Sequence, residues 1–294
     1  MKELKKEKAP GHDGITNEQI KYGAEEITKE LVEIFNLILK KRKIPKQWKL
    51  LDTILLYKKG DKHKIENYRP ISLGATVAKI FSRVIERRIR GILNEQQSRE
   101  QAGFRKNFST TDHLHTINIL IEKCEKYQIE LYSLLIDYTK AFDLVKQKYL
   151  INALGRQGVP ETYIDLIADM YTNLKSRIIT DIQGPYFNIR RGVRQGDPLS
   201  STLFNCLLEE VFRSLDWEGK GLNINGENLS NLRFADDVIL VAKNHKELSE
   251  IVTELMEKGT EAGLEINLEK TVLITKNSEA PKIKVGKHEI EKEN

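Results

Sequence analysis

Two adjacent aspartates between apolar runs constrain this chain more than any other feature. Asp236 and Asp237 follow Phe234-Ala235 and precede the run Val238-Ile239-Leu240-Val241. Short apolar runs on both sides of a polar pair are typical of a β-hairpin with a tight turn. Neighbouring carboxylates repel each other, and loss of solvent strengthens the repulsion. The pattern therefore predicts a hairpin whose tip binds a cation.

A third carboxylate strengthens this prediction. Asp137 ends the strand-like apolar run that starts at Leu131. If that strand lies beside the hairpin in one sheet, the three acids meet at one edge. Oxygen ligands without nearby His or Cys favour Mg²⁺ or Mn²⁺ over Zn²⁺, and two such ions about 3.5–4 Å apart can catalyse phosphoryl transfer. The alternative is that these aspartates only form turns or end strands.

Composition excludes several classes of protein. With 294 residues, 31% charged and 39% hydrophobic, the chain is expected to be globular, and its net charge of +5 is compatible with a polyanionic partner. Two cysteines, Cys124 and Cys206, lie in apolar helical patterns, which argues against a disulfide framework. No apolar run reaches the ~18 residues of a membrane span, and the charged start shows no secretory signal. The protein is expected to be intracellular, in the nucleus or cytoplasm, without a membrane partner.

Zinc and nucleotide-loop motifs are not found. The six histidines show no ligand spacing and no Cys-x-x-Cys occurs. Neither a P-loop nor a dinucleotide-binding glycine motif is present.

Hydrophobic periodicity alternates between helical and strand-like segments. Thr16 and Gln19 form a capping box before a long helix that Pro45 ends. Further helices are expected at about 75–93, 109–125, 144–154, 161–174, 198–215 and 246–262. Strand-like segments are 53–57, 131–136, 177–182, 186–190, 264–275, 283–285 and 289–290, besides the acidic hairpin. This mixture predicts an α+β fold.

Seven short motifs then occur in order along the chain. They are APGHDGI (9–15), NYRPISL (67–73), QAGFR (101–105), LIDYTKAFD (135–143), GVRQGDPLS (192–200), FADD (234–237) and GLEINLEKT (263–271). Together they resemble the reverse transcriptase of non-LTR retrotransposons, the long interspersed elements. FADD alone is a weak signal, whereas seven motifs in order are very specific.

The resemblance implies a right-hand polymerase, with a fingers-palm core built on an antiparallel palm sheet and packed helices. It assigns residues of about 1–125 mainly to the fingers and about 126–294 mainly to the palm, with part of 145–190 as a candidate return to the fingers. Members of this family usually continue into a thumb, whereas this sequence stops at Asn294. The thumb is therefore expected to be missing, and the chain to be a fragment, a truncated copy or a domesticated remnant.

The resemblance also assigns the catalytic acids. Asp137 and Asp236 would bind both metal ions, Asp237 would be the weaker partner, and the backbone carbonyl of Tyr138 would add a ligand. Lys270 would donate a proton to pyrophosphate as a general acid. The simpler interpretation of Lys270 is a solvated strand lysine.

Nucleotide-binding roles fall on a second group of residues. Arg69 would grip triphosphate oxygens bidentately, supported by Lys59 and Lys62, whose simpler interpretation is a solvated turn. The Phe142 ring would block a ribose 2′-OH and so select dNTPs, unless it is a plain core aromatic.

Gln195 and Gly196 would allow close approach of a nucleotide or template base; otherwise they form an ordinary loop before a helix. Arg105 and Arg194 are candidate contacts to template or nucleotide.

The implied activity is RNA-directed DNA polymerisation, by two-metal transfer from a dNTP to a primer 3′-OH. Its partners would be an RNA template, a DNA primer and dNTPs, and its cofactors two Mg²⁺ ions, with Mn²⁺ as the alternative; protein partners stay unknown. Three alternatives remain. They are a non-catalytic nucleic-acid-binding remnant of the same fold, an RNA-dependent RNA polymerase, and a maturase-type RNA-folding cofactor.

Overall fold

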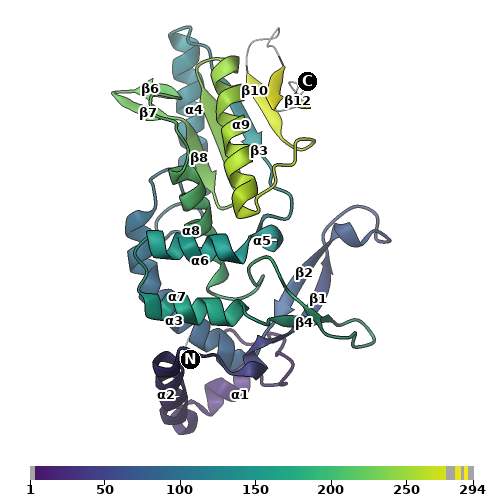
Figure 1. Ribbon diagram of the computed structural model, residues 1–294. Helices are drawn as coiled ribbons and strands as arrows, with labels where there is room; N and C mark the ends of the chain where they lie inside the picture. Colours follow the sequence, from purple (N-terminus) through teal and green to yellow (C-terminus); the bar gives the residue numbers. More distant parts are fainter. Residues whose placement is uncertain (1–3, 276–281, 286–287, 291–294) are drawn as a thin grey trace. The chain divides into compact units, whose positions relative to one another are not determined.

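The computed structural model describes residues 4–275, 282–285 and 288–290. The chain divides into two compact units (Figure 1). Unit 1 comprises Met1–Glu95 and Leu150–Leu203, and unit 2 comprises Gln96–Tyr149 and Phe204–Asn294. The chain therefore leaves unit 1, returns to it and leaves it again. No helix in the described part of the chain is long and apolar enough to cross a membrane.

Unit 1 begins with two helices where the sequence predicted one. The Thr16–Gln19 capping box is confirmed, but α1 (Asn17–Tyr22) ends at Gly23, whose N–H bonds to the Gln19 carbonyl. A second helix, α2 (Ala24–Lys41), follows at once. The prediction of one continuous helix was wrong because helical periodicity continues across the glycine, which caps one helix and starts the next.

Long helices supply the core of unit 1. α3 (Thr76–Gln96) buries Phe81, Ile85 and Ile89 completely, and α7 (Glu161–Tyr171) buries Leu166 and Ile167. The unit also holds most of α6 (Gln147–Arg156). The expected helix at about 144–154 is α6, shifted by two to three residues, and a short helix, α5 (Ala141–Leu144), precedes it without having been predicted.

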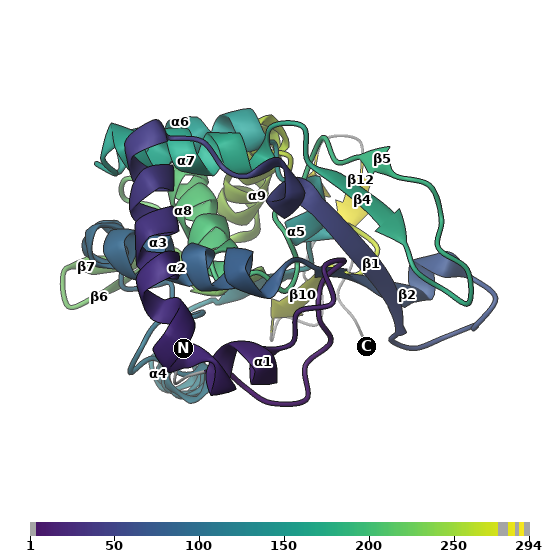
Figure 2. The same cartoon turned by 90° about the horizontal axis from the view of Figure 1, so that it is seen from below.

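A four-stranded sheet of order β2-β1-β4-β5 completes unit 1 (Figure 2). β1 (Leu50–Tyr57) pairs antiparallel with β2 (Tyr68–Leu73) and parallel with β4 (Lys175–Ile178), and β5 (Phe187–Asn188) pairs with β4. A short 3-10 helix, Lys46–Lys49, precedes β1, and another, Ile65–Asn67, precedes β2. The β1–β2 connection is the basic turn noted in the sequence.

Unit 2 is built on an antiparallel sheet of order β10-β3-β9-β8. Its strands are β3 (Tyr132–Ile136), β8 (Asn231–Phe234), β9 (Asp237–Ala242) and β10 (Val272–Thr275). β3 is central, with Leu134 opposite Leu240 of β9 and Leu273 of β10. The α+β class is confirmed, and β3 and the hairpin lie in one sheet as the sequence predicted.

Helices lie against both faces of this sheet (Figure 1). α9 (His245–Ala262) packs on β3 and β9. Leu120 and Cys124 of α4 (Thr110–Lys126) pack on Val241 of β9, in a cluster that also contains Leu222. Residue 222 belongs to the hairpin of β6 (Leu222–Ile224) and β7 (Glu227–Leu229).

The last segments of unit 2 differ from the expected long strand over 264–275. Only Val272–Thr275 forms a strand, because a turn at 268–270 interrupts the segment. The small hairpin of β11 (Ile283–Val285) and β12 (His288–Ile290) is confirmed. It contacts α9, where the Ser249 hydroxyl donates to the Lys284 carbonyl.

Candidate functional site

The acidic hairpin of unit 2 has the tight turn that the sequence predicted. Phe234 pairs with Asp237, so Ala235 and Asp236 alone form the turn. Ala235 has a φ of 57°, a left-handed conformation that is uncommon for a residue with a Cβ. The Ala235 side chain is buried, Asp236 is half-buried and Asp237 is exposed. Both carboxylates thus stand at one end of the sheet.

Asp137 reaches the same end. β3 and β9 pair antiparallel with Ile136 opposite Val238, so the register places the next residue of β3, Asp137, across from Asp237. Among the described residues no three His, Cys, Asp or Glu side chains are grouped tightly enough to hold a metal ion. The acids therefore share an edge without forming a closed ligand set, and their role as metal ligands stays a prediction.

A short extension of the sheet fixes the backbone after Asp137. Asn267 N donates to the Asp137 carbonyl at 2.7 Å, and Thr139 N donates to the Glu265 carbonyl at 2.8 Å. Between them Tyr138 bridges to Ile266.

The two other predicted residues at this edge differ in exposure. The Tyr138 ring is buried and its hydroxyl has no hydrogen-bond partner within the described residues; burial raises the pKa of this hydroxyl well above its usual range. Lys270 is exposed, in the turn that starts at Asn267.

The predicted sugar-sensing ring is held by other aromatics. Phe142 lies in α5 and is half-buried. It stacks on the fully buried Phe204 of α8 (Ser200–Arg213), with ring centroids 4.4 Å apart and an interplanar angle of 11°. Phe104 meets it edge-on at 6.4 Å. Phe142 as a whole is only half-buried, and its predicted contact with a ribose 2′-OH stays a prediction.

Residues 98–105, here termed the supporting segment, lie against the hairpin. Arg233 N donates to the Glu100 carbonyl and Ala102 N donates to the Arg233 carbonyl, both at 2.8 Å. Arg105 donates to the carbonyls of Ser98 at 2.6 Å and Gln101 at 2.8 Å. Its guanidinium also lies 4.2 Å from the Phe108 ring centroid, and burial lowers the pKa of Arg105. Arg105 therefore has a structural role, and its contact with nucleic acid stays a prediction.

A buried ion pair beneath the hairpin was missed from the sequence. Arg233 of β8 is 2% exposed, and its Nη2 lies 3.2 Å from Glu209 of α8. Burial lowers the pKa of Arg233, against the opposing effect of Glu209. A charged residue inside an otherwise apolar strand was the available signal, because such a residue is buried only with a partner.

Unit 1 carries the predicted phosphate-binding residues. Arg69 is exposed on β2, and Lys59 and Lys62 are exposed in the turn before it. The Lys62 ammonium lies 5.6 Å from the Tyr57 ring centroid. All three cations belong to one β1–β2 hairpin.

The Gln195-Gly196 backbone lies beside the same strand. Ser72 N of β2 donates to the Gln195 carbonyl at 3.0 Å. Gly196 has a φ of +102°, and a Cβ there would lie 3.2 Å from the Ser72 carbonyl oxygen. This conformation favours glycine, and the close approach to Ser72 adds to the strain that a side chain would cause.

Arg194, by contrast, is used inside unit 1. It is 8% exposed, donates to the Met170 carbonyl and lies over the Tyr171 ring at 5.4 Å. Burial raises the pKa of Tyr171 to about 12. The contact of Arg194 with template or nucleotide stays a prediction.

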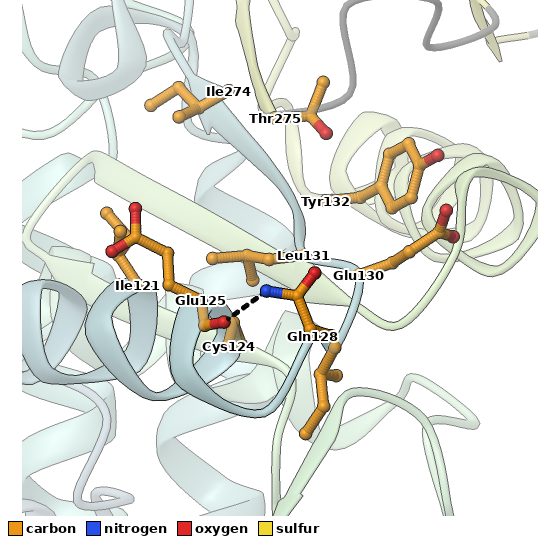
Figure 3. A pocket seen from close by; sticks show the side chains of 10 residues that line it. Ile121, Cys124, Glu125, Gln128, Glu130, Leu131, Tyr132, Ile274 and Thr275 are labelled. Carbon is orange, nitrogen blue, oxygen red and sulfur yellow. Dashed lines mark hydrogen bonds between the residues drawn. The ribbon is translucent and has the colours of Figure 1, made fainter.

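A pocket of about 390 Å³ opens at the opposite end of the unit 2 sheet (Figure 3). Tyr132, which starts β3, and Thr275, which ends β10, line it together with Cys124 and Gln128. Gln128 donates to the Glu125 carbonyl at 2.9 Å. β3 runs from this pocket toward Asp137, so the pocket is separate from the acidic edge.

Comparisons with known proteins agree on one family. A profile described as "Reverse transcriptase (RNA-dependent DNA polymerase)" matches residues 57–289. The chain is 29% identical over 288 residues to the Pol polyprotein of a type-1 retrotransposable element R2 from Nasonia vitripennis, which covers 96% of this chain and 27% of the relative. An R2 relative from Popillia japonica is 30% identical over 92% of this chain and 37% of its own length. The chain thus spans less than two fifths of either relative.

Solved structures show the same fold at low identity. Telomerase from Candida tropicalis, in complex with a TWJ fragment of telomeric RNA, matches 87% of this chain and 45% of its own, with a TM-score of 0.61 and 16% identity. The apo telomerase truncated from its C-terminal domain gives a TM-score of 0.60. These likenesses support a fingers-palm polymerase fold.

Proposed function

Because this chain belongs to the reverse transcriptase (RNA-dependent DNA polymerase) family, in its non-LTR retrotransposon branch, we propose that it copies RNA into DNA by joining dNTPs to a primer 3′-OH. Unit 2, with its β10-β3-β9-β8 sheet, is the proposed palm, and unit 1 the proposed fingers. RNA template, DNA primer and dNTPs are the proposed substrates.

The antiparallel register at the acidic edge carries this proposal. It sets Asp137 across from Asp237, whose chain neighbour Asp236 lies in the turn at the same end of the sheet. Reverse transcriptases use divalent metal ions, and three carboxylates at one sheet edge are the hard oxygen donors that Mg²⁺ or Mn²⁺ prefers. We assign two Mg²⁺ ions to Asp137, Asp236 and Asp237, with the Tyr138 carbonyl as a further ligand. When bound, such ions activate the primer 3′-OH and stabilise charge on the leaving pyrophosphate.

Two other residues of unit 2 would select the sugar of the nucleotide and protonate the leaving pyrophosphate. The Phe142 ring, fixed by its stack on Phe204, would stand where a ribose 2′-OH comes and favour dNTPs. Lys270, exposed in the turn joined to Asp137 through Asn267, would donate a proton to pyrophosphate.

Unit 1 would bind the triphosphate. Arg69 offers a bidentate fork to phosphate oxygens, and Lys59 and Lys62 add positive charge from the same hairpin. The Gln195-Gly196 backbone beside β2 would let a nucleotide or template base approach closely. Synthesis needs positioning and charge rather than covalent chemistry by the protein.

Primer extension tests the proposal directly. An oligo(dT)-primed RNA template with Mg²⁺ and dNTPs is extended by the wild type, while Asp236→Asn loses on the order of 10³-fold in rate. Asp216→Asn is the control, because Asp216 is an exposed acid of unit 2 outside the acidic edge. It is expected to keep wild-type activity.

Three results would contradict the proposal. Substantial extension by Asp236→Asn would remove this residue from the reaction. Extension by neither protein, with no metal-dependent dNTP binding by the wild type, would favour the non-catalytic remnant instead. Preference for rNTPs over dNTPs would favour an RNA polymerase.

A further inference from the structure

We infer that Gln101 is a positioning residue, whose side chain fixes the backbone of the Ala235-Asp236 turn and thereby the catalytic acid Asp236. Gly103 is the second part of this device. The inference deepens the proposed function and rests on it. It begins from the observation that the supporting segment lies along the edge of the hairpin as a short additional strand.

The strand-like pairing itself stops before the turn. Arg233 is bonded on both sides of its peptide to the supporting segment, through Glu100 and Ala102, in a parallel bridge with Gln101. Past Arg233 the backbone of the supporting segment makes no further ladder bond among the described residues. The next groups that need partners are the N–H and C=O of Ala235, which is 4% exposed.

The Gln101 carboxamide supplies those partners. Its Oε1 accepts from Ala235 N at 3.0 Å, and its Nε2 donates to the Ala235 carbonyl at 3.5 Å. Oε1 also accepts from Gly103 N at 2.8 Å. Gln101 is 1% exposed, so water does not compete for these bonds. The amide side chain thus makes the pair of bonds that a neighbouring peptide would make.

Gly103 lets the supporting segment come close enough for this. A Cβ on Gly103 would lie 2.1 Å from Ala235 N and 2.8 Å from Ala235 Cα, far inside van der Waals contact. The Gly103 carbonyl accepts from Asn205 Nδ2 at 2.7 Å. The Gly103 carbonyl is therefore held by Asn205 of α8, and the Cα of Gly103 packs against Ala235 of the turn.

The turn needs such support because of its conformation. Ala235 is left-handed, with a φ of 57°, which is unfavourable for a residue with a Cβ. Conformations of this kind persist where the surroundings over-determine them. Since Asp236 is the next residue, rotation at Ala235 would displace its carboxylate. A displacement of about 1 Å at a reacting centre can lower a rate by about 10²-fold.

A matched pair of substitutions separates positioning from general stability. Gln101→Met keeps the shape of the side chain and removes its hydrogen bonds. Asn231→Leu makes the same kind of change at a buried amide of β8, 8% exposed, whose Nδ2 bonds to Ser230 at 3.1 Å and not to the turn. Gln101→Glu keeps the acceptor for both N–H groups and is the conservative variant.

The first readout is metal binding without turnover. Mn²⁺ titration of the full chain, followed by electron paramagnetic resonance, is expected to show about tenfold weaker binding for Gln101→Met, as for other residues that orient ligands. Asn231→Leu should bind as the wild type does, and Gln101→Glu should recover most of the affinity. Wild-type binding by Gln101→Met, or an equal loss in Asn231→Leu, would overturn the inference. If Gln101→Met does not fold, Gln101→Asn replaces it in the comparison with Asn231→Leu, because it keeps an amide but is one methylene too short to reach Ala235; about tenfold weaker Mn²⁺ binding is again expected.

A second readout keeps the inference separate from the proposed function. Hydrogen exchange of the Ala235 amide should become faster in Gln101→Met and stay unchanged in Asn231→Leu. If the wild type shows no Mn²⁺ binding that depends on Asp236, the proposed function fails, and hydrogen exchange alone then tests whether Gln101 fixes the turn. Unchanged exchange of the Ala235 amide in Gln101→Met would overturn the inference, whatever the result of the metal titration.

Discussion

Phe142 illustrates how single residues of this site depend on uncharged neighbours. Its ring stacks flat on Phe204, which is fully buried in α8, and meets Phe104 edge-on. Aromatic pairs in these geometries hold a ring in one orientation beyond what burial alone achieves. The proposed wall against a ribose 2′-OH would therefore be a ring held in one orientation.

Shortening this wall should weaken sugar discrimination. Phe142→Ala is expected to raise the efficiency of rNTP use relative to dNTP use by roughly 10- to 100-fold, because a pocket contact of this size is worth about that much. The measurement is kcat/KM for both nucleotides in single-nucleotide primer extension.

Tyr127→Ala is the matched control, since Tyr127 is an aromatic of unit 2 that is 62% exposed. An unchanged ratio in Phe142→Ala would assign its ring to packing alone.

At this scale the sequence predicted the acids but not their support. Asp137, Asp236 and Asp237 could be proposed because each adjoins a strand-like apolar run, which is local information, whereas the pairing of β3 with β9 joins segments far apart in the chain. Gln101 and Ala235 are 134 positions apart, and nothing in composition or periodicity links them. The charge of Arg233 inside a strand-like segment indicated a buried partner but not which one, because its ion pair with Glu209 depends on how α8 packs under the sheet.

Among the elements, α7 is joined to the segment before β1 by one carboxylate, that of Asp169. Asp169 accepts from Ile44 N at 2.8 Å and lies 2.9 Å from Lys49 and 3.1 Å from Lys43. Its side chain is 8% exposed. Burial alone would raise the pKa of Asp169, but the bonds from Ile44, Lys49 and Lys43 outweigh it and hold the pKa below the usual 3.8.

This arrangement predicts a pH-dependent loss of stability. A carboxyl with a lower pKa in the folded state stabilises the fold fully above the unfolded value, and the effect disappears as pH falls through the folded value. Asp169→Asn should therefore cost about 2 kcal/mol at neutral pH, with the difference from wild type shrinking below about pH 4. Urea unfolding at several pH values measures it.

Asp165→Asn serves as the comparison in the same helix. Asp165 pairs with Arg42 at 2.8 Å, but both side chains are more than 40% exposed, so little change is expected. A pH-independent effect of Asp169→Asn would contradict the role given to its charge.

The ends of helices and strands could be predicted where a capping motif sets them, but not where tertiary contacts set them. The capping boxes at Thr16 and Ser109 start α1 and α4 as expected. The break between α5 and α6 could not be foreseen, because Lys146 N bonds to the Ala262 carbonyl at the end of α9. The sequence of 264–267 predicts part of a long strand. The segment makes only a short bridge, through backbone hydrogen bonds to residues 137–139, before the turn at 268–270 ends it.

For the whole molecule, the resemblance predicts a division into fingers and palm, with part of 145–190 returning to the fingers, and this division stays a prediction. The borders of the two compact units could not be read from the sequence, because those near residues 95, 149 and 203 fall within or beside α3, α6 and α8 and have no linker composition. The charge of the chain was readable at once: 48 basic against 43 acidic residues, a net of +5.

That excess predicts salt-sensitive binding of nucleic acid. Affinity for an RNA–DNA hybrid should fall by ~10²-fold or more between 50 and 200 mM KCl, because bound phosphates release counterions. Fluorescence anisotropy in EDTA measures it, and Asp236→Asn should follow the same salt dependence. Affinity that is independent of salt would argue against recognition through the phosphate backbone.

The absent side chain at Gly103 bears on how degenerate genomic copies of such a sequence are judged. With 2.1 Å between an added Cβ and Ala235 N, even alanine at position 103 would force the supporting segment away from the acidic turn. A copy that keeps all three acids but has lost this glycine is therefore expected to have a displaced turn, and intact acids alone do not show that its site is intact.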